Sequence, residues 1–222
     1  MSMIVHPGTS NVIIPTETVV LDGELSLPDH PQGIVLFVNG SGGGGISTRN
    51  RRLAADLNQA GYATLLFGLR SHEERHRLTG PHSATELADR LLAVTEWVEL
   101  EPEVGDLPQG YFAAGVGAGA ALLAAARAGQ KIHALVCRGG RPDLAHDWLS
   151  EVLAPTLLLV GEHDLTVRNL NREAETHLRC PHRMVVVPGA GHNFEEPGSL
   201  ESVSREATAW FSCHLAGARI SG

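Results

Sequence analysis

Short apolar runs alternate with longer amphipathic stretches along most of the chain. The apolar runs, each bounded by turn-forming residues, cover 34–38, 63–67, 109–114, 132–137, 156–160 and 183–187. Helical periodicity is present at 48–60, 84–100, 119–128, 168–178 and 200–214. Strands alternating with helices predict an α/β fold, in which helices cover both faces of a parallel sheet.

The opening of the chain has a different pattern. Residues 12–27 form shorter extended segments that are interrupted at Asp22-Gly23. An Asp-Gly dipeptide between extended segments is typical of a tight hairpin turn. We therefore expect an antiparallel hairpin with its break at this dipeptide, added to one edge of the sheet.

Length, charge and cysteine usage narrow the class of protein. The chain has 222 residues, 43% of them hydrophobic, which suits one α/β domain over 1–222. Its formal charge of -8, without blocks of like charge, predicts neither a nucleic-acid nor a membrane partner. The first residues lack a signal-peptide pattern, so we expect a cytoplasmic protein. Cys137, Cys180 and Cys213 have unrelated spacings and are predicted to be reduced thiols.

Glycines and polar residues follow each of the predicted parallel strands. In an open parallel sheet, ligands bind beyond the carboxyl ends of the strands. We therefore expect the functional site at this edge. The segments concerned are Asn39-Gly40-Ser41-Gly42, Gly68-Leu69-Arg70, Gly115-Val116-Gly117-Ala118-Gly119, Cys137-Arg138-Gly139-Gly140, Gly161-Glu162-His163-Asp164 and Pro188-Gly189-Ala190-Gly191-His192.

The segment from Gly115 to Gly119 has the form of a nucleophile elbow without a nucleophile. The GxSxG pattern surrounds a protruding serine with small residues at a sharp turn from strand to helix. Aligned on that pattern, Gly117 occupies the serine position. The amide of Ala118 would then follow the vacant position and contribute to an oxyanion hole.

Asp164 and His192 follow the elbow in the chain order nucleophile, acid, base of α/β-hydrolases. In such a triad the carboxylate orients the imidazole, and the imidazole moves the proton. The plainer alternative is an ordinary loop aspartate and a surface histidine. Their position after successive strands favours the triad interpretation.

The glycine-rich loop from Asn39 through Gly40, Ser41 and Gly42 is a candidate oxyanion loop, since glycines let backbone amides converge on a developing charge. Arg138 could present its guanidinium fork to a carboxylate or phosphate. The Arg141–Asp143 pair is equally well explained as a loop brace.

Two other motifs predict different chemistry. The loop after residue 39 also matches GxGxxG, and Gly115, Gly117 and Ala120 form a GxGxxA pattern that would place an NADP-type phosphate near Arg138. Against this, Gly68 stands where a dinucleotide site has an acidic residue. Residues 72–76 spell HExxH, a zinc motif when it lies on a buried helix, but the surrounding sequence is polar. We assign neither a metal nor a cofactor.

Taken together, these segments resemble the dienelactone hydrolase-like branch of the α/β-hydrolase superfamily, particularly small bacterial members. The resemblance rests on the Asn39 loop with the following STRNR, the elbow, CRGGRPDL from Cys137 and HNFEEPG from His192, and covers nearly the whole chain. It implies a mostly parallel sheet of about eight strands, no large lid domain, and ester or lactone chemistry. Such relatives usually carry His, Asp and Ser at the positions of Asn39, Gly68 and Gly117.

The function expected from these observations is a small-molecule hydrolase that lacks serine acyl-enzyme chemistry. Three routes stay open: attack by Cys137 as a thiolate, attack by Ser41, and general-base catalysis by His192 oriented by Asp164. The expected ligand is an ester, lactone or carboxylate. A non-catalytic binding protein and an NADP-type binder are the alternatives, and the sequence leaves the oligomeric state open.

Overall fold

The computed structural model describes residues 8–39, 47–71, 73–74 and 82–216, and every structural statement below concerns these residues. Strands and helices alternate as the periodicity predicts. The strands are β1 (Gly8–Pro15), β2 (Val20–Leu27), β3 (Ile34–Asn39), β4 (Ala63–Gly68), β5 (Gln109–Ala114), β6 (Ile132–Arg138), β7 (Thr156–Gly161) and β8 (His182–Val187). The helices are α1 (Thr48–Gln59), α3 (Ala84–Leu100), α4 (Val116–Ala128), α5 (Leu165–Glu175) and α6 (Ser199–His214), with 3₁₀ segments η1 (Gly129–Lys131) and η2 (Pro142–Glu151).

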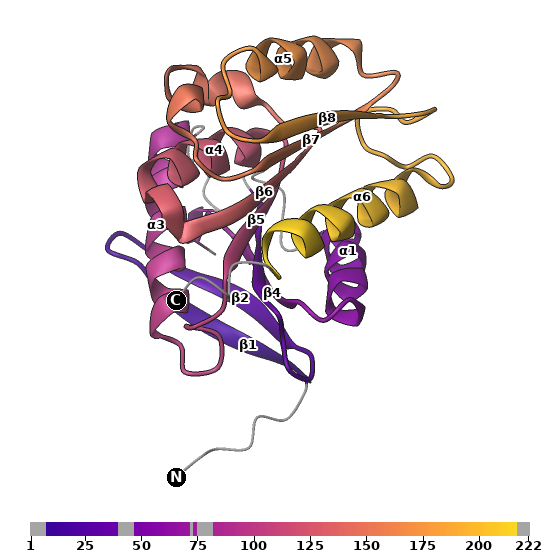
Figure 1. Cartoon of the computed structure of the whole chain (residues 1–222). Helices are drawn as coiled ribbons and strands as arrows, with labels where there is room; N and C mark the ends of the chain where they lie inside the picture. Colours follow the sequence, from indigo (N-terminus) through magenta and orange to yellow (C-terminus); the bar gives the residue numbers. More distant parts are fainter. Residues whose placement is uncertain (1–7, 40–46, 72, 75–81, 217–222) are drawn as a thin grey trace.

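The strands form one sheet in the order β1-β2-β4-β3-β5-β6-β7-β8 (Figure 1). Strand β2 pairs antiparallel with β1 and with β4, whereas the strands from β4 to β8 are parallel. The mostly parallel sheet of about eight strands is therefore confirmed. No large lid domain is present among the described residues.

Two hydrophobic cores lie on opposite faces of the sheet because successive strand residues point to opposite sides. In β3, Ile34, Leu36 and Val38 belong to one core, while Val35 and Phe37 belong to the other. Helices α3 and α4 and the segment η2 cover the first face, and α1 and α6 cover the second (Figure 1). Both faces of the parallel strands from β4 to β7 in the sheet order are buried, which explains why these strands are continuously apolar in sequence, whereas the edge strand β8 is partly exposed.

The N-terminal hairpin forms, but it turns at a different place from the one predicted. Its turn lies between β1 and β2 at residues 16–19, where the Thr16 hydroxyl donates to the Val19 carbonyl at 2.7 Å and accepts from the Val19 amide. Gly23 lies inside β2, opposite Val12 of β1 and Phe67 of β4. The prediction of a break at Asp22-Gly23 was wrong, because the side chain of Thr16 closes the turn without the dipeptide.

Two helices that matter for the site begin earlier than the periodicity predicts. Helix α4 starts at Val116 instead of residue 119, and α5 starts at Leu165 instead of residue 168. The first turn of α4 consists of small residues, and Leu165 is exposed, so neither first turn carries the apolar spacing of a buried face. Consequently Gly117 and Gly119 lie inside a helix rather than in a loop before it.

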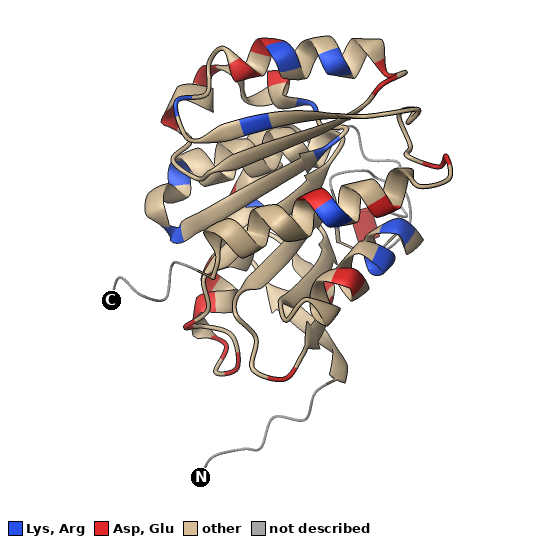
Figure 2. Ribbon diagram, turned by 45° about the vertical axis from the view of Figure 1, so that its right-hand side comes forward, with Lys and Arg blue, Asp and Glu red and all other residues tan. Residues whose placement is uncertain are grey.

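Charged residues are dispersed over the helices and loops, while the sheet is almost free of them (Figure 2). Both acidic and basic residues lie on the outer helices in this view. None of the helices that the structure describes has the length and hydropathy needed to cross a membrane.

Candidate active site

The carboxyl ends of β3, β4, β5 and β6 lie side by side in register at one edge of the sheet. Asn39 of β3 is in register with Gly68 of β4 and with Ala114 of β5, and Ala114 is in register with Arg138 of β6. The sequence-predicted segments that follow these residues therefore start from the same edge of the sheet. This shared edge brings together groups that are as much as 100 residues apart in the chain.

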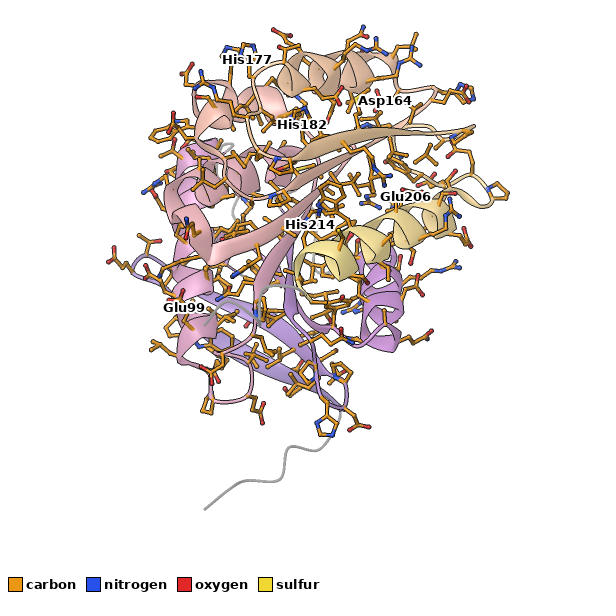
Figure 3. All side chains as sticks on the ribbon, in the orientation of Figure 1. Glu99, Asp164, His177, His182, Glu206 and His214 are labelled. Atoms are coloured by element: carbon orange, nitrogen blue, oxygen red, sulfur yellow. The ribbon has the colours of Figure 1, made fainter. Side chains whose placement is uncertain are left out.

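Asp164 and His192 form a hydrogen-bonded pair at this edge. His192 Nδ1 lies 2.6 Å from Asp164 Oδ2. The Asp164 side chain is 12% exposed and the His192 side chain 62% exposed, so the carboxylate is sheltered and the imidazole is open. Asp164, labelled in Figure 3, also caps α5. Its Oδ1 accepts a hydrogen bond from the Val167 amide at 3.3 Å. The cap fixes the carboxylate that in turn orients the histidine ring.

Hydrogen bonds join the two loops that carry this pair. The His163 amide donates to the Ala190 carbonyl at 2.9 Å, and the Glu162 carboxylate accepts from the Gly189 amide at 2.7 Å. At the end of β7, a Cβ on Gly161 would lie 2.5 Å from the carbonyl oxygens of Ala190 and Gly191. Only glycine allows so close an approach, and the approach sets the separation of Asp164 from His192.

The turn between β5 and α4 is made by Gly115. Its backbone has φ 55° and ψ -129°, a combination that L side chains rarely adopt and that is typical of a strained turn. The space where its Cβ would lie is open, with no atom within 4 Å. Its carbonyl accepts hydrogen bonds from the amides of Ala118 (3.2 Å) and Arg141 (3.0 Å), which hold the turn in place.

The structure thus places the sharp turn at Gly115, whereas the sequence pattern pointed to Gly117. Gly117 is buried in the first turn of α4, and the Ala118 amide is already bonded to Gly115. The amides of Val116 and Gly117, at the first helical positions, have no acceptor within the helix. In the sequence, Gly115 has the small residues Ala113 and Gly117 two positions away on either side, but Gly117 likewise has Gly115 and Gly119, so the pattern alone does not separate the two.

A cavity of about 200 Å³ connects the turn with the histidine. Its lining comes from the start of α1, the turn after β5, the end of β6 and the histidine loop. The lining residues are Ser47, Arg49, Asn50, Ala114, Gly115, Arg138, Gly139, His192 and Asn193. Of the predicted site residues, the structure brings Arg138 and His192 together here. Asp164 joins them through its bond to His192.

Arg138 is a cation at the edge of this cavity; the residue is partly exposed, while its Nη1 atom is buried. Burial, with a smaller contribution from the nearby charge of Arg49, lowers the pKa of Arg138 to about 10, so the guanidinium stays protonated at neutral pH. Its Cζ lies 5.8 Å from the centre of the Phe194 ring, within cation–π distance. Its Nη1 is buried and has no hydrogen-bond partner among the described residues.

Cys137 does not face this cavity but lies in the hydrophobic core, with no exposed surface. Burial raises the pKa of the Cys137 thiol to about 12. A thiol of this kind is neutral at physiological pH, and the thiolate is the nucleophilic form. The geometry therefore gives no support to Cys137 as an attacking group.

The remaining sequence-predicted groups fall into two sets. Arg141 and Asp143 form a two-bonded ion pair at 2.7 and 2.8 Å, which agrees with their interpretation as a loop brace. Gly40, Ser41, Gly42 and the side chain of Asn39 lie outside the described residues, as do His72 and His76 of the HExxH motif.

Sequence reasoning missed the role of Glu74, the middle residue of that motif. Glu74 accepts two hydrogen bonds from Arg90 (2.7 and 2.8 Å), and Arg90 also donates to the Leu69 carbonyl. This bonding, with Arg90 as the main cause, lowers the pKa of Glu74 to about 2. Glu74 thus braces the segment after β4. In the part of the chain that the structure describes, no group of three or more His, Cys, Asp or Glu side chains could hold a metal ion.

Comparison with known proteins gives relatives in sequence and in structure. The crystal structure of a dienelactone hydrolase from Anabaena variabilis is 44% identical, with a TM-score of 0.91, and the match covers 94% of this chain and 99% of that one. A Mycobacterium tuberculosis protein provisionally named a phosphoribosyl transferase is 48% identical over 204 residues. That match covers 92% of this chain but 46% of the relative, so the chain spans about half of the relative's length.

More distant structures share the fold alone. Est1E from Butyrivibrio proteoclasticus is 16% identical, with a TM-score of 0.77 over 90% of this chain and 97% of that one. An α/β serine hydrolase homologue from Coxiella burnetii is 18% identical, with a TM-score of 0.75 over 94% of this chain and 99% of that one. No protein-family model matches the chain.

Proposed function

This chain belongs to the dienelactone hydrolase family of the α/β-hydrolase fold, and on that premise we propose that it hydrolyses a small ester or lactone without forming an acyl-enzyme. One observation carries the proposal: the hydrogen-bonded His192–Asp164 pair shares a site with a turn, at Gly115, that has no side chain. At the turn itself, Gly115 offers His192 no oxygen or sulfur to activate. We therefore infer that water is the nucleophile.

The hydrogen bonding of the two ring nitrogens of His192 supports a role as general base. When Nδ1 carries the proton and donates it to Asp164, Nε2 of the neutral imidazole has a free lone pair. Nε2 can then take a proton from a water molecule as that water attacks the carbonyl carbon. The Asp164 carboxylate stabilises the imidazolium that forms.

The same groups complete the reaction. As the tetrahedral intermediate collapses, the bond from the carbonyl carbon to the leaving oxygen breaks, and His192 returns its proton to that oxygen. One ester and one water give one carboxylic acid and one alcohol, or a hydroxy acid from a lactone. We propose that the Val116 amide, at the first position of α4, stabilises the oxyanion, as the residue after an elbow does in this fold.

A non-catalytic binding protein is the second candidate, because the turn at Gly115 presents no side chain that could attack a substrate. About 200 Å³ is less than the roughly 300–1,000 Å³ of pockets that enclose a drug-sized ligand. A cavity of this size suits a small acid or one end of a larger molecule. The two functions differ in whether ligand binding leads to product.

The test is turnover of a panel of small esters and lactones by the wild-type protein and by His192→Ala. Loss of a general base typically costs about 10²–10⁴ in rate, so we expect the variant to lose at least about 100-fold. His163→Ala is a matched control, because His163 is an exposed histidine on the adjoining loop that does not bond to Asp164.

Intact-mass measurement during turnover separates the mechanisms. The proposal predicts product without a covalent acyl adduct on the protein. An adduct, or full activity in His192→Ala, would contradict it. Saturable binding of panel members with no product at any enzyme concentration would favour the binding protein instead.

A further inference from the structure

We propose that the cavity at Gly115 binds an anionic oxygen group, a carboxylate or a phosphate, between Arg138 and the start of α4. The inference goes beyond the proposed function, because it concerns a ligand held by the free protein. It holds whether or not His192 transfers a proton. Three independent features of the cavity support it.

The first feature is that the guanidinium group of Arg138 has unused hydrogen-bonding capacity. A buried charged group that lacks a hydrogen-bond partner is costly, so buried guanidinium groups are ordinarily paired. Arg138 Nη1 is buried and unpartnered among the described residues, and the guanidinium remains charged although burial depresses its pKa. Its contact with the Phe194 ring stabilises one face of the guanidinium but accepts none of its N–H groups in the ring plane.

The second feature is that Arg49 and His192, which also line the cavity, are already paired with carboxylates. Arg49, which also lines the cavity, is paired with Glu195 at 2.7 Å and donates to the Asn193 carbonyl at 3.1 Å. His192 is bonded to Asp164. Arg138 is thus the cation of the cavity lining without a partner in the described chain, and one anionic group would complement it.

The third feature is the uncapped start of α4, a helix of 13 residues. No side chain caps this helix, and its first turn contains no acidic residue. The partial positive charge at a helix N-terminus and its free amides favour an anion. Because Gly115 lines the cavity and has open space around its Cβ position, an anion in the cavity can lie beside the residue from which this helix starts.

The strand register explains why these features meet. Arg138 ends β6 directly beside Ala114 of β5, and Gly115 follows Ala114. The guanidinium and the helix start therefore lie on the same edge of the sheet. In a relative with a serine or cysteine at the turn, a side chain would occupy part of this space. Because Gly115 has no such side chain, this space can hold an anion.

The experiment is a calorimetric titration of the full-length protein with inorganic phosphate and, separately, with acetate, both at constant ionic strength maintained with sodium chloride. We expect saturable binding of at least one probe by the wild-type protein. Arg138→Met, which keeps the length and packing of the side chain, should weaken that binding at least about tenfold, as loss of a charged hydrogen bond does. Arg127→Met is the matched control, because Arg127 is a surface residue paired with Asp89, outside the cavity lining.

The ratio of the two affinities identifies the group as a phosphate or a carboxylate. Absence of saturable binding for both probes would overturn the inference, and so would equal binding by wild type and Arg138→Met. Thermal unfolding without added anion is the second measurement. We expect Arg138→Met to unfold at the same temperature as wild type or higher, because it loses an unpaired buried charge. A marked fall would indicate that Arg138 is a structural brace and would contradict the inference. Neither readout depends on turnover, so failure here leaves the test of His192 unaffected.

Discussion

The two halves of the candidate site differ in the side chains that they present. The acid–base half, residues 161–164 and 188–193, has both the backbone arrangement and the side chains, with His192 bonded to Asp164 at 2.6 Å. The elbow half, residues 113–118, has the backbone arrangement alone. Gly115 adopts the strained dihedral angles of an elbow turn, but it has no side chain that could attack a substrate.

This difference shows that the geometry of an elbow does not require a nucleophile. The turn is held by backbone hydrogen bonds to the Gly115 carbonyl and by the packing of α4 against the sheet. Glycine is also the residue that adopts such dihedral angles at the lowest cost. The fold is therefore compatible with a turn that has no side chain; under the two proposals, catalysis depends on the acid–base half and anion binding on Arg138.

The largest expected effect comes from removing the charge that orients His192. Asp164→Asn should lower turnover about a thousandfold, because the amide no longer favours the productive tautomer or the imidazolium. Asparagine is as good a helix cap as aspartate, so α5 and the unfolding temperature should be preserved. Steady-state kinetics check the loss of turnover, and thermal unfolding checks that the stability is preserved. Unchanged turnover in a folded variant would show that the acid–base half is not catalytic.

The next largest effect is on stability and concerns the close contact between the two loops of the acid–base half. Gly161→Ala places a Cβ within 2.5 Å of two carbonyl oxygens, and we expect it to lower the free energy of unfolding by about 2–3 kcal/mol. Gly191→Ala is the control: like Gly161 it has no positive φ, but the nearest atom to its Cβ would be the carboxylate oxygen of the flexible Glu196 side chain at 2.8 Å. Urea unfolding compares the two variants. Equal losses would mean that the close approach at Gly161 is not what sets the loop spacing.

The smallest effect lies outside both halves, at the Glu74–Arg90 brace. Because the pKa of Glu74 is lowered from 4.5 to about 2 in the folded protein, its stabilising contribution is full above about pH 4.5 and is lost as the pH falls towards 2. After discounting for solvent screening we expect about 1 kcal/mol. Unfolding of wild type and Glu74→Gln should differ at pH 7 and converge near pH 2. A constant difference across that range would contradict the assignment.

The fold and the acid–base half could be predicted from sequence, and the position of the elbow residue could not. Strands buried on both faces leave a continuous apolar signal, and Asp164 and His192 lie in the loops that follow β7 and β8. The elbow lies in a run of glycine and alanine where several alignments of GxSxG are possible. Only the start of α4 at Val116 and the dihedral angles of Gly115 distinguish them.

The same reason explains why Arg138 and Cys137 were hard to separate in sequence. They are neighbours at the end of β6, and alternation along a strand places one side chain in the core and the next in the cavity. Their burial depends on which face α4 and η2 cover, and that is a property of the packed molecule. The structure puts the thiol in the core and the guanidinium at the site.

The central claim is that the site is an assembled hydrolase site with a vacant nucleophile position at Gly115. It is tested most directly by labelling with a fluorophosphonate probe, which reacts with activated serines, in wild type, Gly115→Ser and Gly117→Ser. We predict that Gly115→Ser alone is labelled, and that adding His192→Ala to it abolishes the labelling. Labelling of the wild-type protein, or of Gly117→Ser in place of Gly115→Ser, would contradict the claim.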